Sequence, residues 1–514
     1  MKKKLSVLFL LPLLLTGCNN GSSDSGAAKP SNEPTPIVPD VSNSNTSGEY
    51  VPQIKEKTTI ELWSITGQNN QAQLQSYIDE FRKLEPNVTV TNTIQTGMGY
   101  NELKSAVVTK LATGDYPDRV QCYPDHVAEY INYGKAVNLD PYIKNPTYGW
   151  TQEDKDDIYP AFLEEGSAYA VDGTYSVPYC KSTEARYYNK GVLVGLDLHS
   201  IDPTINGGKS LDEAYFNDLT WEELFGKLCP ALIKYNSQLP DDKKILKSDD
   251  KYHAVFAYDS DDNLFITLAK QYGIGYTSIG ADGKGHFDFG EGENKTKRMA
   301  LLTQFHEYKE KGYLITKGLA EGNYTNAYFN TQNTLFSVGS TGGYKYQFSA
   351  ANPMDVGVAP IPHAKGKDLA IINQGPSLTI LDHDDENRRL ASWLLYKTIT
   401  NKENCLDWAI NSGYMGIRKS VTESEDYQEA ATTRGKDLNT LDRLLARNRT
   451  YSTDEKVLNS LYVSPAFLGS STARTQVSGV LTNALTSTKT GAEYQAELNK
   501  LFDDAYNACL LAVK

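Results

Sequence analysis

The residue types that perform catalysis occur in this chain of 514 residues, but not in the spacing of a catalytic motif. The seven histidines are scattered and contain no H-E-x-x-H pair. Gly208-Lys209-Ser210 resembles the end of a phosphate-binding loop, but Pro203 stands where that loop needs glycine. Gly339-Ser340-Thr341-Gly342-Gly343 lacks the spacing of a nucleophile elbow. We therefore expect no enzyme, no bound metal and no cofactor.

The acidic clusters do not point to chemistry either. The pairs Glu164-Glu165 and Asp384-Asp385 are adjacent in sequence, and neighbours of this kind do not share a helix face. A glycan-degrading enzyme needs two carboxylates roughly 5–10 Å apart across a cleft. The sequence favours no particular pair of Asp or Glu residues for this role. Residues 259–263 (D-S-D-D-N) resemble a calcium loop but lack its glycine at the sixth position and its closing glutamate. A ligand-contacting loop or a helix cap is the better interpretation.

Cys18 has the sequence context of a lipidated cysteine. It follows Leu15-Thr16-Gly17, which is preceded by three lysines at positions 2–4 and an apolar run at 5–15. That run is shorter than the ~20 residues that span a bilayer, so it is typical of a secretory signal peptide. The residues before Cys18 resemble a bacterial lipobox, which implies cleavage there and a lipid on the sulfur. We expect residues 1–17 to be a signal peptide and the mature chain to be anchored at the extracytoplasmic face of the cell membrane; a signal peptide with a chance cysteine is the alternative.

Composition excludes further classes of protein. Hydrophobic residues make up 39% of the chain and charged residues 22%, as in globular domains with a core. The formal net charge of −13 disfavours binding to nucleic acid, whose phosphates need a basic surface. Of the six cysteines none forms a C-x-x-C pair, and without Cys18 an odd number remains. We expect buried free thiols rather than disulfides or a zinc site.

A low-complexity segment precedes the folded part of the chain. Residues 18–57 are rich in Asn, Ser, Gly and Pro and have the composition of a flexible tether. From Thr58 strand and helix patterns alternate: a strand at 59–63, a helix through 74–84, a strand at 88–90, a helix through 103–111 and a strand near Val120. This alternation predicts a parallel α/β sheet, in which ligands bind beyond the carboxyl ends of the strands.

Short sequence blocks follow one another in a characteristic order after Thr58. They are I-E-L-W (60–63), F-R-K-L-E-P (81–86), G-D-Y-P-D (114–118), V-P (177–178) with Y-Y-N-K (187–190), L-T-W-E-E-L (219–224), F-S-V-G-S (336–340), G-V-A-P-I-P (357–362) and S-G-Y-M-G-I-R (412–418). In this order and spacing the chain resembles the extracellular solute-binding proteins of bacterial sugar importers, the maltose-binding-protein-like family.

The resemblance implies an α/β architecture, the two-lobe periplasmic-binding-protein fold with three hinge crossings and a ligand cleft between the lobes. It places the crossings near 181–185, 372–376 and 414–418. Lobe 1 is then expected over residues 58–181 and 376–413, and lobe 2 over residues 186–372 and 418–514. A ligand that contacts both lobes favours the closed state.

Four side chains are candidates for ligand contact, each with a structural alternative. Trp63 ends the first strand and would stack on a sugar ring or fill a core between the lobes. Asp125 would accept hydrogen bonds from sugar hydroxyls or cap a helix. Ser340 precedes an expected helix and would bind an anionic or hydroxyl-rich ligand or serve a turn. Arg474 would donate paired bonds to an anion or to vicinal hydroxyls, or form a salt bridge; by resemblance, an arginine here touches phosphate in the branch that binds glycerol phosphates.

The resemblance adds four further candidates. Tyr100 matches a ligand tyrosine of the same glycerol-phosphate branch. Ser182 lies on the first crossing, where small hydroxyls face the ligand in this family, and Gly375 lets the backbone approach the ligand. Tyr414 matches the aromatic residue of the T-G-Y-x-P block, although Gly416 replaces its proline.

These observations predict an extracellular solute-binding lipoprotein of an ABC importer. We expect it to capture a carbohydrate, in particular an oligosaccharide, by hinge closure and to deliver it to the permease. Glycerol 3-phosphate or a related polyol phosphate is the alternative ligand; a surface glycan-acting enzyme and an adhesin are alternatives of other classes. The expected partners are the small solute, the permease subunits and the membrane through the lipid on Cys18, and not nucleic acid.

Overall fold

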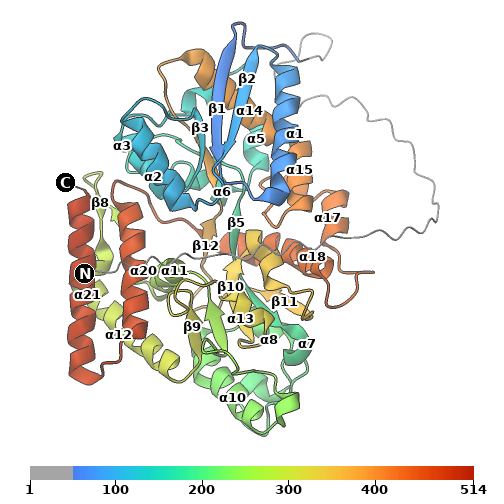
Figure 1. The fold of residues 1–514 in the computed structure, drawn as a ribbon, viewed down its shortest axis with the longest axis vertical. Coiled ribbons are helices and arrows are strands. Elements are labelled where there is room, and N and C mark those ends of the chain that lie inside the picture. The colour runs from blue at the N-terminus through green and yellow to red at the C-terminus, as the bar shows by residue number, and fades with distance from the viewer. Residues whose placement is uncertain (1–49, 514) are drawn as a thin grey trace, which may run out of the picture. The chain divides into compact units, whose positions relative to one another are not determined.

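Five strands form the first sheet in the computed structural model, which describes residues 50–513 (Figure 1). The strand order is β2-β1-β3-β13-β4. β1 pairs in parallel with β2 and with β3, whereas β13 is antiparallel to both β3 and β4. The predicted parallel pairing is therefore confirmed for the first three strands, but the sheet is mixed because β13 enters it from the second sheet. The bounds are β1 (Thr58–Ser64), β2 (Val88–Ile94), β3 (Arg119–Cys122), β4 (Val177–Pro178) and β13 (Ser377–Ile380).

Seven strands form the second sheet. Six of them follow the order β14-β12-β5-β10-β6-β9, and β11 pairs with β5. β10 is parallel to β6 and antiparallel to β5. The bounds are β5 (Ser182–Asn189), β6 (Phe256–Tyr258), β9 (Leu314–Thr316), β10 (Phe336–Ser340), β11 (Val356–Ala359), β12 (Ile371–Gln374) and β14 (Leu461–Tyr462); β7 (Ser278–Ile279) and β8 (Gly285–His286) form a separate pair.

The core of the first sheet is covered by amphipathic helices. In α1 the apolar residues Leu74, Tyr77, Ile78 and Phe81 recur at helical spacing and are all at most 3% exposed. Burial of each such side chain stabilises the fold by about 1.5–3 kcal/mol. The helices of this part of the chain are α1 (Gln68–Leu84), α2 (Tyr100–Leu111), α3 (Pro124–Asn132), α4 (Asp140–Ile143), α5 (Gln152–Asp157), α6 (Pro160–Glu165), α14 (Glu386–Ile399), α15 (Lys402–Asn411), α16 (Lys419–Thr422) and α17 (Glu425–Ala431).

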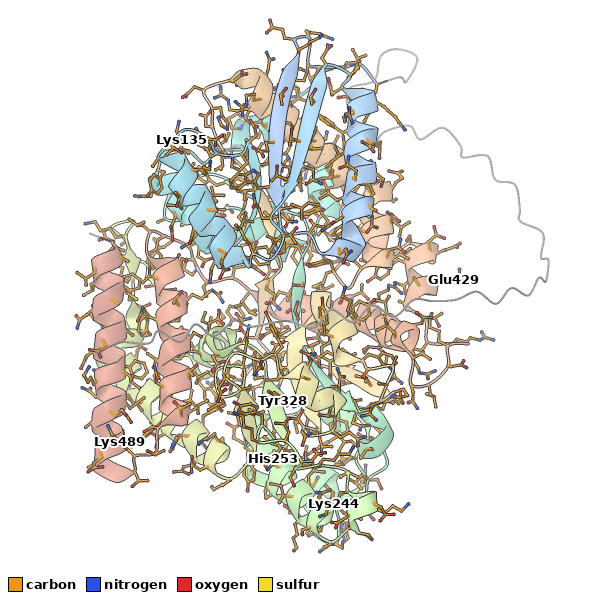
Figure 2. All side chains as sticks on the ribbon, in the orientation of Figure 1. Lys135, Lys244, His253, Tyr328, Glu429 and Lys489 are labelled. Carbon is orange, nitrogen blue, oxygen red and sulfur yellow. The ribbon has the colours of Figure 1, made fainter. Side chains whose placement is uncertain are left out.

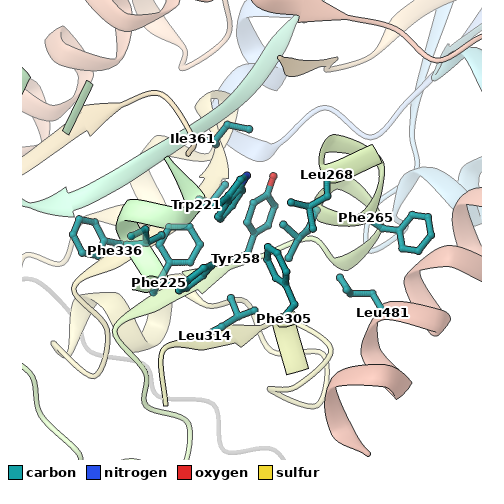
Figure 3. Close-up of a cluster of buried hydrophobic side chains, with 14 of the residues drawn as sticks. Trp221, Phe225, Tyr258, Phe265, Leu268, Phe305, Leu314, Phe336, Ile361 and Leu481 are labelled. Carbon is teal, nitrogen blue, oxygen red and sulfur yellow. The ribbon is translucent and has the colours of Figure 1, made fainter. Parts of the chain in front are cut away.

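An aromatic cluster fills the core of the second sheet (Figure 3). The rings of Trp221 and Phe225 stack with centroids 5.9 Å apart, and Trp221 Nε1 donates to Gln271 Oε1 at 2.7 Å, which satisfies the buried indole. The helices here are α7 (Lys190–Leu193), α8 (Glu213–Asn217), α9 (Trp221–Glu223), α10 (Cys229–Ser237), α11 (Asp261–Tyr272), α12 (Gly292–Glu310), α13 (Asn326–Asn330), α18 (Leu441–Ser452), α19 (Glu455–Ser460), α20 (Ser470–Thr486) and α21 (Gly491–Ala512). Short 3-10 or π turns complete it: η1 (Ile205–Gly208), η2 (Leu224–Leu228), η3 (Asp241–Lys243), η4 (Asp288–Gly290) and η5 (Thr341–Gln347).

The chain passes between the two sheets at the first two expected hinge positions. It leaves the first sheet after β4 and enters the second at β5, and it returns between β12 and β13 through Gly375. After the third expected position, 414–418, Val421 and Tyr427 still pack in the core of the first sheet, and Leu444 is in the core of the second. In this third segment the chain therefore passes from the first core to the second later than expected. The exact bounds of the two lobes stay a prediction.

The expected start of the folded part is too late. Tyr50 Oη donates to Glu85 Oε1 at 2.6 Å, and the backbone of Gln53 and Ile54 donates to the same carboxylate at 2.7 and 3.0 Å. Ile54 is fully buried. The buried Glu85 carboxylate thus holds in place residues 50, 53 and 54, whose composition predicts a flexible tether. The signal peptide, Cys18 and the tether up to residue 49 lie outside the described residues.

Charged side chains such as Lys135, Lys244, Glu429 and Lys489 lie at the periphery of the ribbon (Figure 2). None of the helices within residues 50–513 combines the length and the apolar character that crossing a membrane requires. Five cysteines, 122, 180, 229, 405 and 509, are buried and unpaired, which confirms the prediction of free thiols.

Candidate ligand-binding site

A cleft of about 530 Å³ is lined by residues that follow strands of both sheets. The first turns of α2, α3, α11 and α20 contribute to its wall, as do Asn373 and Gln374 at the end of β12. α3 begins two residues after β3, and α11 begins three residues after β6, so both helices start at the carboxyl ends of strands. This is the expected position of a ligand site in an α/β fold.

Tyrosine side chains form much of the cleft wall. Tyr100, Tyr123, Tyr276 and Tyr324 all line it, and the rings of Tyr100 and Tyr123 meet edge to face with centroids 4.7 Å apart. Burial raises the pKa of the Tyr100, Tyr123 and Tyr276 phenols above their usual value. Their hydroxyls are therefore neutral groups that both donate and accept hydrogen bonds.

Arg474 is held in the cleft by an ion pair. Its Nη1 donates to Asp262 Oδ2 and to Asn263 Oδ1, both at 2.7 Å, and Ser260 Oγ donates to Asp262 Oδ1 at 2.7 Å. Burial opposes ionisation of Asp262, but the Arg474 guanidinium together with hydrogen bonds from Ser260 and from the Asn263 backbone outweighs it, and the pKa of Asp262 is lowered. Arg474 lines the cleft, and its Nε and Nη2 donate no hydrogen bond to a residue within 50–513.

Asp125 offers a carboxylate in the same cleft. Its side chain is 13% exposed, and its nearest cationic candidate is His126 Nε2 at 3.9 Å. Burial lowers the pKa of His126 to about 4, so the imidazole is neutral at pH 7 and this contact is not an ion pair. The Asp125 carboxylate is therefore available to accept hydrogen bonds from a ligand.

A buried carboxyl group supports the cleft from behind. Glu184 on β5 is 1% exposed, accepts a bond from Asn263 Nδ2 at 2.9 Å and contacts the Tyr258 hydroxyl. Burial raises the pKa of Glu184 to about 8. Asn263 in turn donates to Gln374 Oε1 at 3.3 Å, so this group orients two side chains that line the cleft.

Of the eight predicted ligand residues, Tyr100, Asp125 and Arg474 line this cleft together. Ser340 lines a second cavity of about 650 Å³, and its Oγ donates to Ser182 Oγ at 3.3 Å. The roles of these residues in binding stay predictions.

The other predicted residues lie outside the cleft wall. Trp63 is 8% exposed and packs in a buried apolar cluster with Val120 and Leu103. Gly375 has φ +83°, and a Cβ on it would lie 2.1 Å from the carbonyl oxygen of Cys180. The backbone that approaches Gly375 closely is therefore that of the first crossing segment, at Cys180. Tyr414 stacks on Trp408 with centroids 6.1 Å apart and lies near Tyr100, whose pKa it helps to raise.

Several cleft residues carried no signal in the sequence. Tyr276, Lys317 and Tyr324 lie between regular elements, where no periodicity marks them. Asp262 and Asn263 belong to the acidic segment 259–263, for which the sequence predicts a ligand-contacting loop or a helix cap, and they line the cleft at the start of α11. No group of three or more His, Cys, Asp or Glu in the described part of the chain is placed to hold a metal ion.

A buried ion pair ties the three expected crossings together. Lys181, fully buried, donates from Nζ to both oxygens of Glu165, at 2.8 and 2.7 Å, and to the Gly375 carbonyl at 2.8 Å. Ser377 Oγ donates to the same carboxylate at 2.7 Å. The Lys181 carbonyl accepts from Met415 N at 2.7 Å. Lys181 thus joins three segments of the chain that are distant in sequence.

Comparisons with known proteins agree with this architecture. The family model described as bacterial extracellular solute-binding protein matches residues 76–434. No curated protein sequence matches the chain. Similar solved structures include UgpB from Mycobacterium tuberculosis in complex with glycerophosphocholine, with 18% identity, a TM-score of 0.64 and coverage of 89% of this chain and 98% of that one. The cyclic α-maltosyl-1,6-maltose binding protein from Arthrobacter globiformis has 15% identity, a TM-score of 0.60 and coverage of 88% and 99%. The maltotriose-bound MalE domain from Bdellovibrio bacteriovorus has 14% identity, a TM-score of 0.59 and coverage of 89% and 100%.

Proposed function

We propose, from the premise that this chain belongs to the bacterial extracellular solute-binding proteins, that it captures a carbohydrate and delivers it to an ABC importer. Proteins of this family bind solutes and are not enzymes, so the function lies in recognition and release. Capture by closure of the two lobes requires that the ligand contact both of them.

The composition of the cleft wall carries the choice of a carbohydrate. Sugar rings present apolar C–H faces and many hydroxyls, which match tyrosine rings and neutral phenol groups. Asp125 accepts hydrogen bonds from hydroxyls, and Arg474 donates to them through Nε and Nη2. Because Asp262 already compensates its charge, Arg474 does not require an anion.

A polyol phosphate such as glycerol 3-phosphate is the second candidate. Arg474 and Lys317 both line the cleft, and phosphate groups are bound in proteins by such cations. The structurally similar M. tuberculosis protein was solved with glycerophosphocholine. The two candidates differ in how much of the binding free energy depends on Arg474.

A ligand screen with one variant separates the candidates. We would measure melting temperatures and calorimetric affinities with neutral sugars of one to four rings and with glycerol 3-phosphate, since a ligand of the folded state raises the melting temperature. Arg474→Ala should weaken sugar binding less than tenfold but reduce phosphate binding more than a hundredfold, and Arg434→Ala on an exposed loop is the matched control. Binding of the phosphate alone would replace the carbohydrate proposal, and binding of neither class would refute both.

The anchor and the ligand roles of the other predicted residues belong to the same proposal. Cys18 is the expected lipid attachment site, and metabolic labelling of the full chain with an alkyne fatty acid should mark the wild type but not Cys18→Ser. Trp63, Ser182, Gly375 and Tyr414 lie behind or beside the cleft wall, so we expect them to act on closure more than on direct contact. Uptake of a labelled ligand by cells that carry or lack this chain tests delivery to an importer.

A further inference from the structure

A groove of about 620 Å³ lies between α15 and α17, which pack against each other (Figure 1). The inner faces of these helices, with Cys405, Trp408 and Tyr427, belong to the core of the first sheet. Glu429 of α17 lies at the periphery of the molecule (Figure 2). The wall of this α15–α17 groove shares no residue with the ligand cleft or with the second cavity. Its function is therefore separate from contact with the solute.

The groove follows one face of each helix. α15 contributes positions 403, 406, 407, 410 and 411, which have the spacing of a single helix face over two turns. α17 contributes positions 426, 429 and 430 in the same way. Leu406, Ile410 and Ala430 make the floor apolar. An apolar depression between two helices has the shape that receives a third, amphipathic helix.

Four carboxylates border the apolar floor. Glu403 and Asp407 are four residues apart on α15, and Asp426 and Glu429 are three apart on α17. None of the four forms an ion pair with a residue in the described part of the chain, and the donors to Asp407 are neutral. Like charges at this spacing destabilise a helix. Both helices therefore carry an electrostatic cost that a cation from outside would remove.

The cations near the groove do not neutralise these carboxylates. Lys436 lines the groove, but its Nζ donates to the Thr432 carbonyl at 2.5 Å. Arg449 on α18 lies behind the groove and donates to the carbonyl of Ala430, at 2.8 Å, and to that of Ile410. These two bonds tie the ends of α15 and α17 together. The groove is thus formed before a partner arrives, which lowers the entropic cost of binding.

Charge complementarity limits what can occupy the groove. The four carboxylates repel anionic lipid and nucleic acid. Residues 19–49 carry four carboxylates and one lysine, and a second copy of the chain has the same formal net charge of −13, so neither complements the groove. A small polycation would gain nothing from the apolar floor. A basic polypeptide with an apolar face satisfies both the floor and the border.

We propose that the α15–α17 groove docks a basic amphipathic helix of another protein. The apolar face of that helix packs on Leu406, Ile410 and Ala430, and its Lys or Arg side chains pair with the two pairs of carboxylates. Because the groove and the cleft share no residue, this interaction is additional to solute capture and does not depend on which solute is bound.

Synthetic peptides of about fourteen residues, four helical turns, serve as probes. One peptide places leucine on one helix face and lysine on the other, and a second has the same composition in scrambled order. Fluorescence anisotropy measures their affinities for the wild type, for Leu406→Ala and for the double variant Glu403→Lys with Glu429→Lys. The matched controls are Leu511→Ala, which is 66% exposed in the wild type, and the double variant Asp172→Lys with Asp249→Lys, at exposed positions outside all three cavities.

We expect the amphipathic peptide to bind the wild type at least tenfold more tightly than the scrambled one, and less tightly as salt rises from about 0.1 M to about 1 M. The groove double variant should lose at least tenfold in affinity and Leu406→Ala at least threefold, whereas both controls should change less than twofold. Glu429→Lys alone should melt no lower than the wild type by circular dichroism, because it removes a like-charge pair and places a cation in the last turn of α17. Loss of binding would then not result from unfolding.

Three results would overturn the proposal. The wild type could fail to bind the amphipathic peptide, or bind the scrambled peptide equally well. The groove double variant could lose no more affinity than the control double variant, which would mean that the peptide responds to net charge alone. Sedimentation velocity could also show a wild-type dimer that the groove double variant abolishes, and the occupant would then be a second copy. None of these results bears on the proposed solute, whose cleft the variants leave intact.

Discussion

Removal of Lys181 tests whether the buried ion pair at the crossings has the structural role that its contacts indicate. Lys181→Met keeps most of the side-chain volume but leaves the buried Glu165 carboxylate with Ser377 Oγ as its remaining donor within residues 50–513. The side chains of the pair are 0% and 2% exposed, so water cannot replace the lost ammonium. A buried charge that loses its partner costs about 3–5 kcal/mol of unfolding free energy.

The double variant, Lys181→Met with Glu165→Gln, separates the unpaired charge from the loss of packing. The amide oxygen introduced by Glu165→Gln would still accept from Ser377 Oγ but would carry no charge, so we expect the double variant to be more stable than Lys181→Met alone. Lys251→Met is the matched control, because the Lys251–Glu321 pair is 67% and 72% exposed and such pairs contribute about 0–1 kcal/mol.

Urea unfolding followed by tryptophan fluorescence and by circular dichroism measures these free energies, and coincident transitions establish two-state behaviour. A loss for Lys181→Met no larger than that for Lys251→Met would refute the reasoning. A double variant less stable than Lys181→Met would also refute it, because the unpaired carboxylate could not then be the cause.

Three further predictions concern the cleft and the crossings. Asp262→Asn removes the compensating charge from Arg474, so calorimetry should show at least a tenfold gain in glycerol 3-phosphate affinity, since bonds to charged groups contribute about 1.5–3 kcal/mol; no gain would mean that Arg474 does not reach the ligand. Burial raises the pKa of Glu184 from 4.5 to about 8, so the folded state retains a proton that the unfolded state has lost, and wild-type stability falls as pH rises through this window. Thermal unfolding should therefore show Glu184→Gln gaining stability over the wild type between pH 5 and pH 9, and a constant difference would contradict this. Gly375→Ala, with φ +83° and a Cβ 2.1 Å from the Cys180 carbonyl, should lose more than about 1–3 kcal/mol, whereas Gly479→Ala in α20, where nothing lies within 4 Å, should be neutral or stabilising; equal urea midpoints would exclude strain at Gly375.

Elements with a local sequence pattern could be predicted from the sequence. The strand at 59–63 and the helix through 74–84 correspond to β1 and α1, because alternation and helical spacing depend only on neighbouring residues. The antiparallel entry of β13 could not be predicted, since its partner β3 lies more than 250 residues earlier and no periodicity records that pairing.

The candidate site likewise contains residues that the sequence predicts and contacts that it does not. Tyr100 and Arg474 were found from short motifs that resemble a known family, and both line the cleft. The partner of Arg474, Asp262, is 212 residues away, so the ion pair that changes its chemistry was invisible in either motif. Gln347 lies in a short turn after a glycine-rich stretch, and only the fold brings its amide beside Asp259.

The pairing of β4 with β13 also sets the order in which the two halves of the molecule can be completed during synthesis. Among the described strands β4 has no partner except β13, which emerges from the ribosome about 200 residues later. The intervening chain includes β5, β6, β9, β10, β11 and β12, so most of the second sheet is made while the first remains unfinished. Pairings so distant in sequence form slowly. The first sheet can therefore be completed only after most of the second sheet has been synthesised.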